Sequence, residues 1–125
     1  AHLQNERLDT VTSVRGFPIG VRDGLQELFG SGSLDIVDVG ADVRASEVVV
    51  RPVRRLLVAG CAVDHCLVYY ELTTSARSWR VALFHWTPAG TRFEGGGTAP
   101  GGLKSIDDVR RALLSGVITG RPKVW

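Results

Sequence analysis

The sequence of 125 residues has no methionine, only two cysteines and no long apolar run. A transmembrane helix needs about 20 consecutive apolar residues, and the longest runs here, such as residues 56–60, are far shorter. We therefore expect no membrane insertion. With 44% hydrophobic and 22% charged residues, the chain is neither disordered nor fibrous in composition. A chain of this length buries roughly two-thirds of its unfolded surface on folding, which is enough for one compact domain.

An excess of one charge sign is also missing. Lys and Arg number 15 against 13 Asp and Glu, so the formal net charge is only +2. The arginines are scattered from Arg7 to Arg121, whereas nucleic-acid binding requires basic residues gathered on one face. The sequence predicts no nucleic-acid partner.

Motifs for common catalytic chemistry are absent as well. There is no Gly-x-Ser-x-Gly, no phosphate loop and no His-Glu-x-x-His, and the glycines at 95–97 lack a strand-to-helix context. Cys66 and His65 are neighbours on an expected strand and would point to opposite faces, which rules out a nucleophile–base pair. Nothing in their spacing selects Asp64 and Glu94 as paired carboxylates. We expect a protein that is not an enzyme and has no cofactor.

The first part of the chain changes character near residue 17. Residues 1–16 are polar and aperiodic and predict a flexible N-terminal arm, so residues 17–125 are expected to form the single domain. Apolar residues recur at helical spacing over 20–29, and Gly30 follows where a left-handed residue commonly ends a helix. Residues 34–39 alternate loosely, as in an edge strand or an extended connector.

From residue 46 the pattern changes to short strands separated by turn residues. Loops this short join antiparallel strands, because a parallel crossover needs a dozen residues or more. The glycines at 95–97, followed by Pro100-Gly101-Gly102, are expected to end the sheet. The aromatic residues on these strands are expected to be core residues. The expected strands are residues 47–51, 55–60, 66–72, 79–86 and 91–94.

A second helix is expected near the end of the chain. Ser105 followed by Asp108 resembles a capping box, and Gly116 marks the stop. The predicted fold class is therefore α+β, with an antiparallel sheet of about five strands flanked by an N-terminal and a C-terminal helix. The expected apolar face of the second helix consists of Ile106, Val109, Leu113, Leu114 and Val117.

Cys61 and Cys66 are separated by four intervening residues and lie at the ends of adjacent expected strands. That spacing permits a disulfide, two buried free thiols, or a zinc site completed by His65 and His85. Zinc is disfavoured because the sequence contains no second cysteine pair to complete a tetrahedral set. We favour the disulfide, which implies an oxidising compartment and a rigid, protruding tip that carries Asp64 and His65.

Two stretches of the sequence resemble the inhibitor of vertebrate lysozyme (Ivy) family. One is Cys61-Ala62-Val63-Asp64-His65-Cys66, which has the layout of the family's disulfide-closed loop, Cys-Lys-Pro-His-Asp-Cys. The other is residues 109–116, which resemble the family's closing helix and its Ala-Leu-x-Gly ending. The chain departs from the family pattern inside the loop, where Asp64 stands in the place of the family's His and Ala62-Val63 replace Lys-Pro.

The resemblance implies a divergent Ivy-like protein, located in the periplasm after removal of a signal peptide. Its inhibitory loop of Ala62, Val63, Asp64 and His65 would occlude the active-site cleft of a C-type lysozyme. Lysozymes of this class are basic, so a net charge of +2 gives no electrostatic attraction. The alternative is an Ivy-like fold that binds another periplasmic protein, such as a lytic transglycosylase. The sequence leaves a homodimer open.

Overall fold

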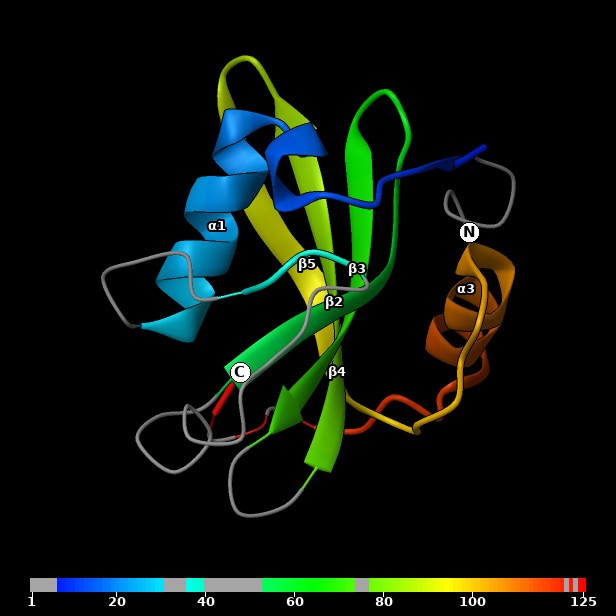
Figure 1. Ribbon diagram of the computed structural model, residues 1–125. Helices are drawn as coiled ribbons and strands as arrows, with labels where there is room; N and C mark the ends of the chain where they lie inside the picture. The colour runs from blue at the N-terminus through cyan, green and yellow to red at the C-terminus, as the bar shows by residue number, and fades with distance from the viewer. Residues whose placement is uncertain (1–6, 31–35, 40–52, 74–76, 121, 123) are drawn as a thin grey trace.

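The computed structural model describes residues 7–30, 36–39, 53–73, 77–120, 122, 124 and 125. It confirms the α+β class, with one helix before the main strands and one after them (Figure 1). None of the helices in these residues is long and apolar enough to cross a bilayer. The elements are β1 (Asp9–Thr10), the short 3-10 helix η2 (Val14–Gly16), α1 (Ile19–Phe29), β2 (Val53–Cys61), β3 (His65–Thr73), β4 (Arg77–Thr87), β5 (Gly90–Ala99) and α3 (Ile106–Ser115).

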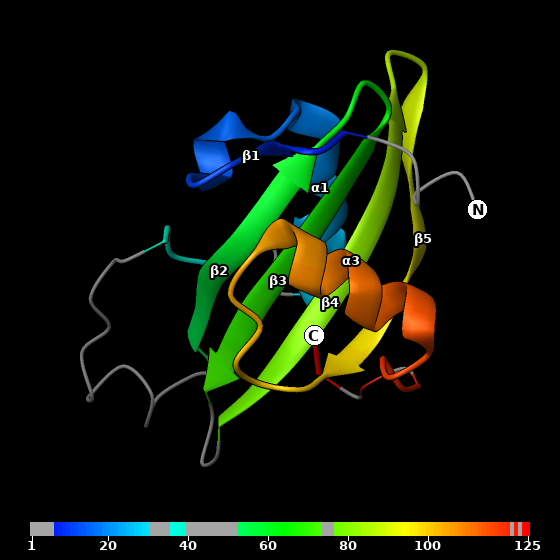
Figure 2. The same cartoon turned by 90° about the vertical axis from the view of Figure 1, so that its right-hand side faces the viewer.

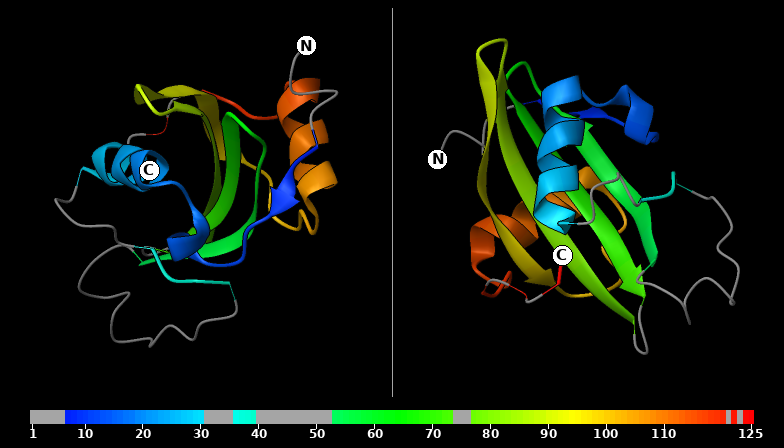
Figure 3. Two further views of the ribbon diagram at one scale, coloured as in Figure 1. Left: turned by 90° about the horizontal axis from the view of Figure 1, so that it is seen from above. Right: turned by 90° about the vertical axis from the view of Figure 1, so that its left-hand side faces the viewer.

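The five strands form one antiparallel meander in the order β1-β2-β3-β4-β5. The helix α3 crosses one face of this sheet (Figure 2), and α1 covers the opposite face (Figure 3). Within the expected connector at 34–39, Val37 forms a single parallel bridge to Arg55. The expected strand at 47–51 lies outside the described residues.

Both faces of the sheet are therefore covered, and β3 shows this most clearly. Its residues from His65 to Leu72 are all buried, because β3 lies between β2 and β4 and beneath a helix on each side. Tyr69 packs in the cluster on the α3 side, and Tyr70 packs in the cluster on the α1 side. The two tyrosines are completely buried, as expected for aromatic residues on strands.

Two glycines allow α1 to approach the sheet closely. A Cβ at Gly24 would lie 2.9 Å from Cε1 of Phe84, and one at Gly20 would collide with Thr91 Oγ1. These glycines are one turn apart and thus share a face of the helix. The aromatic rings of β4 therefore pack directly against the helix backbone.

The expectation of a flexible arm over residues 1–16 is wrong for its described part. Asp9 and Thr10 pair with Cys61 and Gly60 of β2, and Leu8 and Val14 are buried on opposite faces of the sheet. The strand has only two residues and gains its partner from far along the chain, so local sequence periodicity does not reveal it. Residues 1–6 lie outside the described part.

The expectation that the glycines at 95–97 end the sheet is also wrong. Gly95, Gly96 and Gly97 pair with Leu83, Ala82 and Val81, so β5 continues to Ala99. Gly96 has a φ of 141°, and a Cβ there would collide with the carbonyl of Val81. The glycines are thus required by a close strand pairing and do not stop it.

The second helix begins and ends as expected, but its apolar face is narrower. Ser105 Oγ accepts the N–H of Asp108 at 3.1 Å, and Gly116 ends the helix with a φ of 84°. Val109 is buried, whereas Leu114 and Val117 are exposed. Ala112 is buried together with Val109 on the face of α3 that contacts the sheet.

The segment after α3 wraps around the edge of the sheet. Thr119 forms a two-hydrogen-bond bridge with Thr98 on β5, and Trp125 then packs edge-on against Phe93 with ring centroids 5.3 Å apart. The buried Arg54 donates a hydrogen bond from Nε to the carbonyl of Trp125 at 2.6 Å. This segment therefore connects the α3 face to the α1 face.

Candidate functional site

A disulfide closes the tip of the β2–β3 hairpin. Cys61 and Cys66 are partners in the strand register, their Cα atoms are 4.1 Å apart, and their sulfurs are bonded. The prediction of a disulfide is confirmed, and the alternatives that needed free thiols, including the zinc site, are wrong. Among the described residues, no group of three or more His, Cys, Asp or Glu side chains is arranged to hold a metal ion.

Two backbone hydrogen bonds add to the disulfide at this tip. The N–H of Ala62 donates to the carbonyl of His65 at 2.7 Å, which closes the turn, and the N–H of Trp86 donates to the carbonyl of Asp64 at 2.7 Å. The second bond ties the tip to the end of β4 (Figure 1). Val63 at the apex is 91% exposed. The most prominent group on the tip is therefore an apolar side chain on a restrained backbone.

His65 does not project from the tip. Its side chain is only 9% exposed, with Nδ1 2.9 Å from Asp64 Oδ1 and Nε2 3.7 Å from Glu94 Oε2. Its ring meets that of His85 edge-on, with centroids 4.9 Å apart. The expectation that the tip presents both Asp64 and His65 thus fails for the imidazole, which lies at the start of β3 in a packed position.

Asp64 occupies an intermediate position. Its side chain is 36% exposed, and Oδ2 lies 3.7 Å from Nε2 of His85 while Oδ1 contacts His65. Arg92 donates a hydrogen bond to Glu94 at 2.8 Å. That bond is the main reason why the pKa of Glu94 lies below its usual range, and the nearby imidazoles act in the same direction. We call Asp64, His65, His85 and Glu94 the imidazole–carboxylate cluster.

Sequence reasoning named three members of this cluster separately as candidates and considered Glu94 only as a carboxylate partner for Asp64. It did not predict that the four side chains lie together. The signal that would have done so is the hairpin register, which places His65 opposite His85 and His85 opposite Arg92. In the antiparallel meander, residues two strands apart thereby reach one another.

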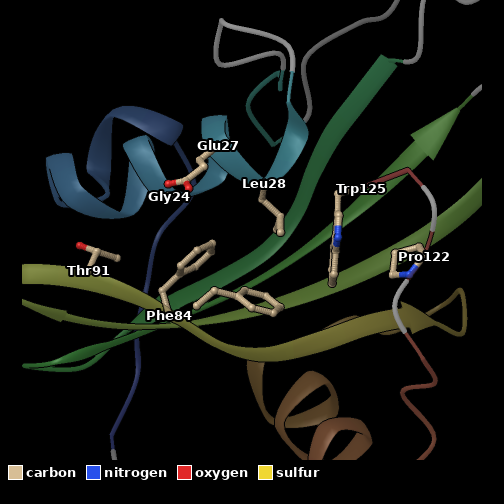
Figure 4. Close-up of a pocket in the computed structure, with 8 residues that line it drawn as sticks. Gly24, Glu27, Leu28, Phe84, Thr91, Pro122 and Trp125 are labelled. Carbon is tan, nitrogen blue, oxygen red and sulfur yellow. The ribbon is translucent and has the colours of Figure 1, made fainter.

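A second feature, which the sequence analysis missed, lies on the α1 face. A hollow with a volume of about 530 Å³ opens between α1 and β5, and Figure 4 shows the rings of Phe84 and Trp125 at its floor and Glu27 at its rim. The glycines of α1 are the sequence feature that relates to this hollow, because they hold the helix close to the aromatic rings.

A scan against protein-family models finds no match to this chain, and searches of curated proteins and of solved structures find none.

Proposed function

We propose that this is an exported, non-enzymatic binding protein that presents the β2–β3 tip to the active-site cleft of a muramidase, with a C-type lysozyme as the first target. The observation that carries the proposal is the restrained tip, with Val63 91% exposed on a turn closed by the Cys61–Cys66 disulfide. A preorganised loop loses little conformational entropy on binding, which favours insertion into a cleft. The disulfide fits an oxidising compartment such as the periplasm.

The contact residues in this proposal are Val63 and Asp64. Because the imidazole of His65 is packed against Asp64 and Glu94, its role is to position Asp64 without touching the target. A lysozyme cleft holds one protonated and one ionised carboxyl group. The Asp64 carboxylate can accept a hydrogen bond from the protonated group, and its contacts with His65 and His85 hold it in place.

A turbidity assay of bacterial cell-wall lysis by a C-type lysozyme tests this proposal. The protein at an equimolar amount is expected to suppress lysis, and Val63→Glu is expected to weaken inhibition about tenfold or more, because it brings a like charge toward the ionised carboxyl group of the cleft. The matched control is Val117→Glu, at an exposed valine beyond α3 and away from the tip. Undiminished lysis at a large excess of the folded protein would rule out lysozyme as the target.

The disulfide has its own test in the same assay. The double variant Cys61→Ser with Cys66→Ser should unfold about 2 kcal/mol more easily, as the chain-entropy model gives for so short a loop. The domain should still fold, since the core does not depend on the bond. Inhibition should fall by a larger factor than the fraction unfolded explains. Full inhibition by the folded double variant would show that the restrained tip is unimportant.

A lytic transglycosylase is the second candidate target, because the charge of the chain argues only against a basic lysozyme. The net charge of +2 gives no steering toward a basic lysozyme, since association of like-charged proteins is slowed. Inhibition of a purified transglycosylase, with no inhibition of lysozyme and the same loss in Val63→Glu, would assign the tip to this target.

A further inference from the structure

The hollow on the α1 face continues along the helix. A second hollow of about 510 Å³ adjoins the first and shares Gly24, Glu27 and Thr91 with it. Together they form what we call the α1–β5 groove, which extends from Ile19 at the start of α1 to Trp125. Each part has a volume typical of a ligand site. A groove of this elongated form suits an extended chain segment better than a compact small molecule.

The floor of the groove is aromatic. Phe93 packs edge-on against Phe84 on one side and Trp125 on the other, with centroids 5.7 Å and 5.3 Å apart, and Trp86 lines the neighbouring part. Phe84 and Trp125 are largely buried in the fold, whereas Phe93 and Trp86 are only partly buried. Such a surface binds apolar side chains and the apolar stems of cationic ones.

The wall formed by α1 is acidic. Asp23 and Glu27 lie one helical turn apart, line the groove and are exposed. Two like charges at this spacing repel each other slightly, and neither makes an ion pair with a residue in the part of the chain that the structure describes. The nearby cation Arg54 is engaged with the Phe29 ring and the Trp125 carbonyl. The groove thus combines an apolar floor with two acidic side chains on one side, which lack an ion-pair partner among the described residues.

We propose that the α1–β5 groove binds an extended segment of a partner protein that carries basic residues next to aromatic ones. The basic side chains contact Asp23 and Glu27, and the aromatic side chains pack on Phe93 and Trp86. The groove opens on the α1 face beside Phe84 and Phe93, and their chain neighbours His85 and Glu94 lie on the opposite face of the sheet. The groove and the β2–β3 tip are therefore different surfaces, although Trp86 lines the groove and its backbone N–H contacts the tip.

Nuclear magnetic resonance titration with the peptide acetyl-Gly-Lys-Phe-Lys-Phe-Gly-amide tests the proposal. The protein has three tryptophans, and Trp86 and Trp125 line the groove while Trp79 packs beside Gly101 on the α3 side. We expect the indole N–H signals of Trp86 and Trp125 to shift and that of Trp79 to remain in place. Binding should weaken as salt is raised, because the rim charges are exposed.

Charge is tested by a matched pair of variants. The double variant Asp23→Asn with Glu27→Gln should bind the peptide about tenfold more weakly or worse, whereas Asp107→Asn, at an exposed acid of α3, should bind it normally. A peptide with glutamate in place of both lysines should not bind. The lysis assay should be unaffected by the double variant, so this test and that of the tip fail independently.

Three results would overturn the proposal. One is no shift of Trp86 or Trp125 at about 1 mM peptide, the weak limit of a specific contact. Another is equal binding of the glutamate peptide. The third is a shift of the same two signals on concentrating the protein alone, which would assign the groove to a second copy of this chain.

Discussion

At the scale of single residues, the imidazole–carboxylate cluster changes the interpretation of the loop sequence. In the motif, Asp64 and His65 are equivalent candidates for contact with a target. In the fold, the strand register buries His65 and leaves Asp64 partly exposed. Val63, whose side chain has no reactive or charged group, is the exposed apex of the β2–β3 tip. The most exposed residues of a hairpin are those of its turn. The pairing register of β2 with β3 decides which residues form that turn.

A second charged contact lies at the other end of β3. Arg77 donates two hydrogen bonds to the buried Glu71, at 2.9 and 3.3 Å, and Thr73 donates a third. The hydrogen bonds from Arg77 are the main reason why the pKa of Glu71 is below its ordinary value of 4.5. A carboxyl group whose pKa is lowered by folding stabilises the fold above the unfolded pKa and loses that contribution as the pH falls through the folded one.

We therefore expect Glu71→Gln to lower the urea midpoint of unfolding at about pH 7, and we expect this effect to shrink as the pH falls through the lowered pKa of Glu71 in the folded protein. Urea unfolding of both proteins at a series of pH values checks this. Glu27→Gln is the control, since Glu27 is exposed and should alter stability little at any of these pH values. A loss for Glu71→Gln that is independent of pH would contradict the ion-pair explanation.

At the scale of elements, α1 shows how packing overrides helix propensity. An alanine in a helix interior is favoured over glycine by about 1 kcal/mol. At Gly24 the added methyl group would meet Cε1 of the buried Phe84 at 2.9 Å. The ring of Phe84 is buried and packs edge-on against Phe93, so the cost of displacing it should exceed the gain in propensity.

Gly24→Ala is accordingly expected to destabilise the protein by about 1–3 kcal/mol, as measured by urea unfolding. Asp23→Ala, at the neighbouring exposed position, is the control and should be neutral or slightly stabilising. A more stable Gly24→Ala protein would mean that α1 can move away from the sheet at little cost, and it would remove the packing explanation for both glycines.

Elements determined by local interactions were predictable from the sequence, whereas those determined by distant partners were not. The helix ends at Gly30 and Gly116 and the cap at Ser105 follow from backbone chemistry within a few residues. The strand β1 and the continuation of β5 through Gly96 depend on pairing partners that the local pattern does not contain. The α1–β5 groove was not predictable for the same reason.

At the scale of the whole molecule, the meander places β3 in the most protected position. It pairs along its length with β2 and β4, and eight of its nine residues are buried. Opening β3 therefore requires separating the sheet and both helices. By contrast, β1 is only two residues long and pairs along one edge.

Native-state hydrogen exchange is expected to reflect this order. The amides of β3 and the central part of β4 should exchange only through global unfolding, and those of β1 should exchange faster through local opening. Exchange measured residue by residue at low denaturant checks the order. Equal protection of β1 and β3 would indicate that the chain opens only as one cooperative unit.

The segment that crosses the sheet edge also affects how the protein can be handled. The carbonyls of Val124 and Trp125 accept hydrogen bonds from Arg80 and Arg54, and the Trp125 side chain is buried against Phe93. An affinity tag or surface attachment joined directly after Trp125 would pull on this anchor and disturb the groove beside it. Attachment on the N-terminal side of β1, which lies at the opposite edge of the sheet from β5, leaves this anchor intact and is the better choice for immobilised binding measurements on the groove.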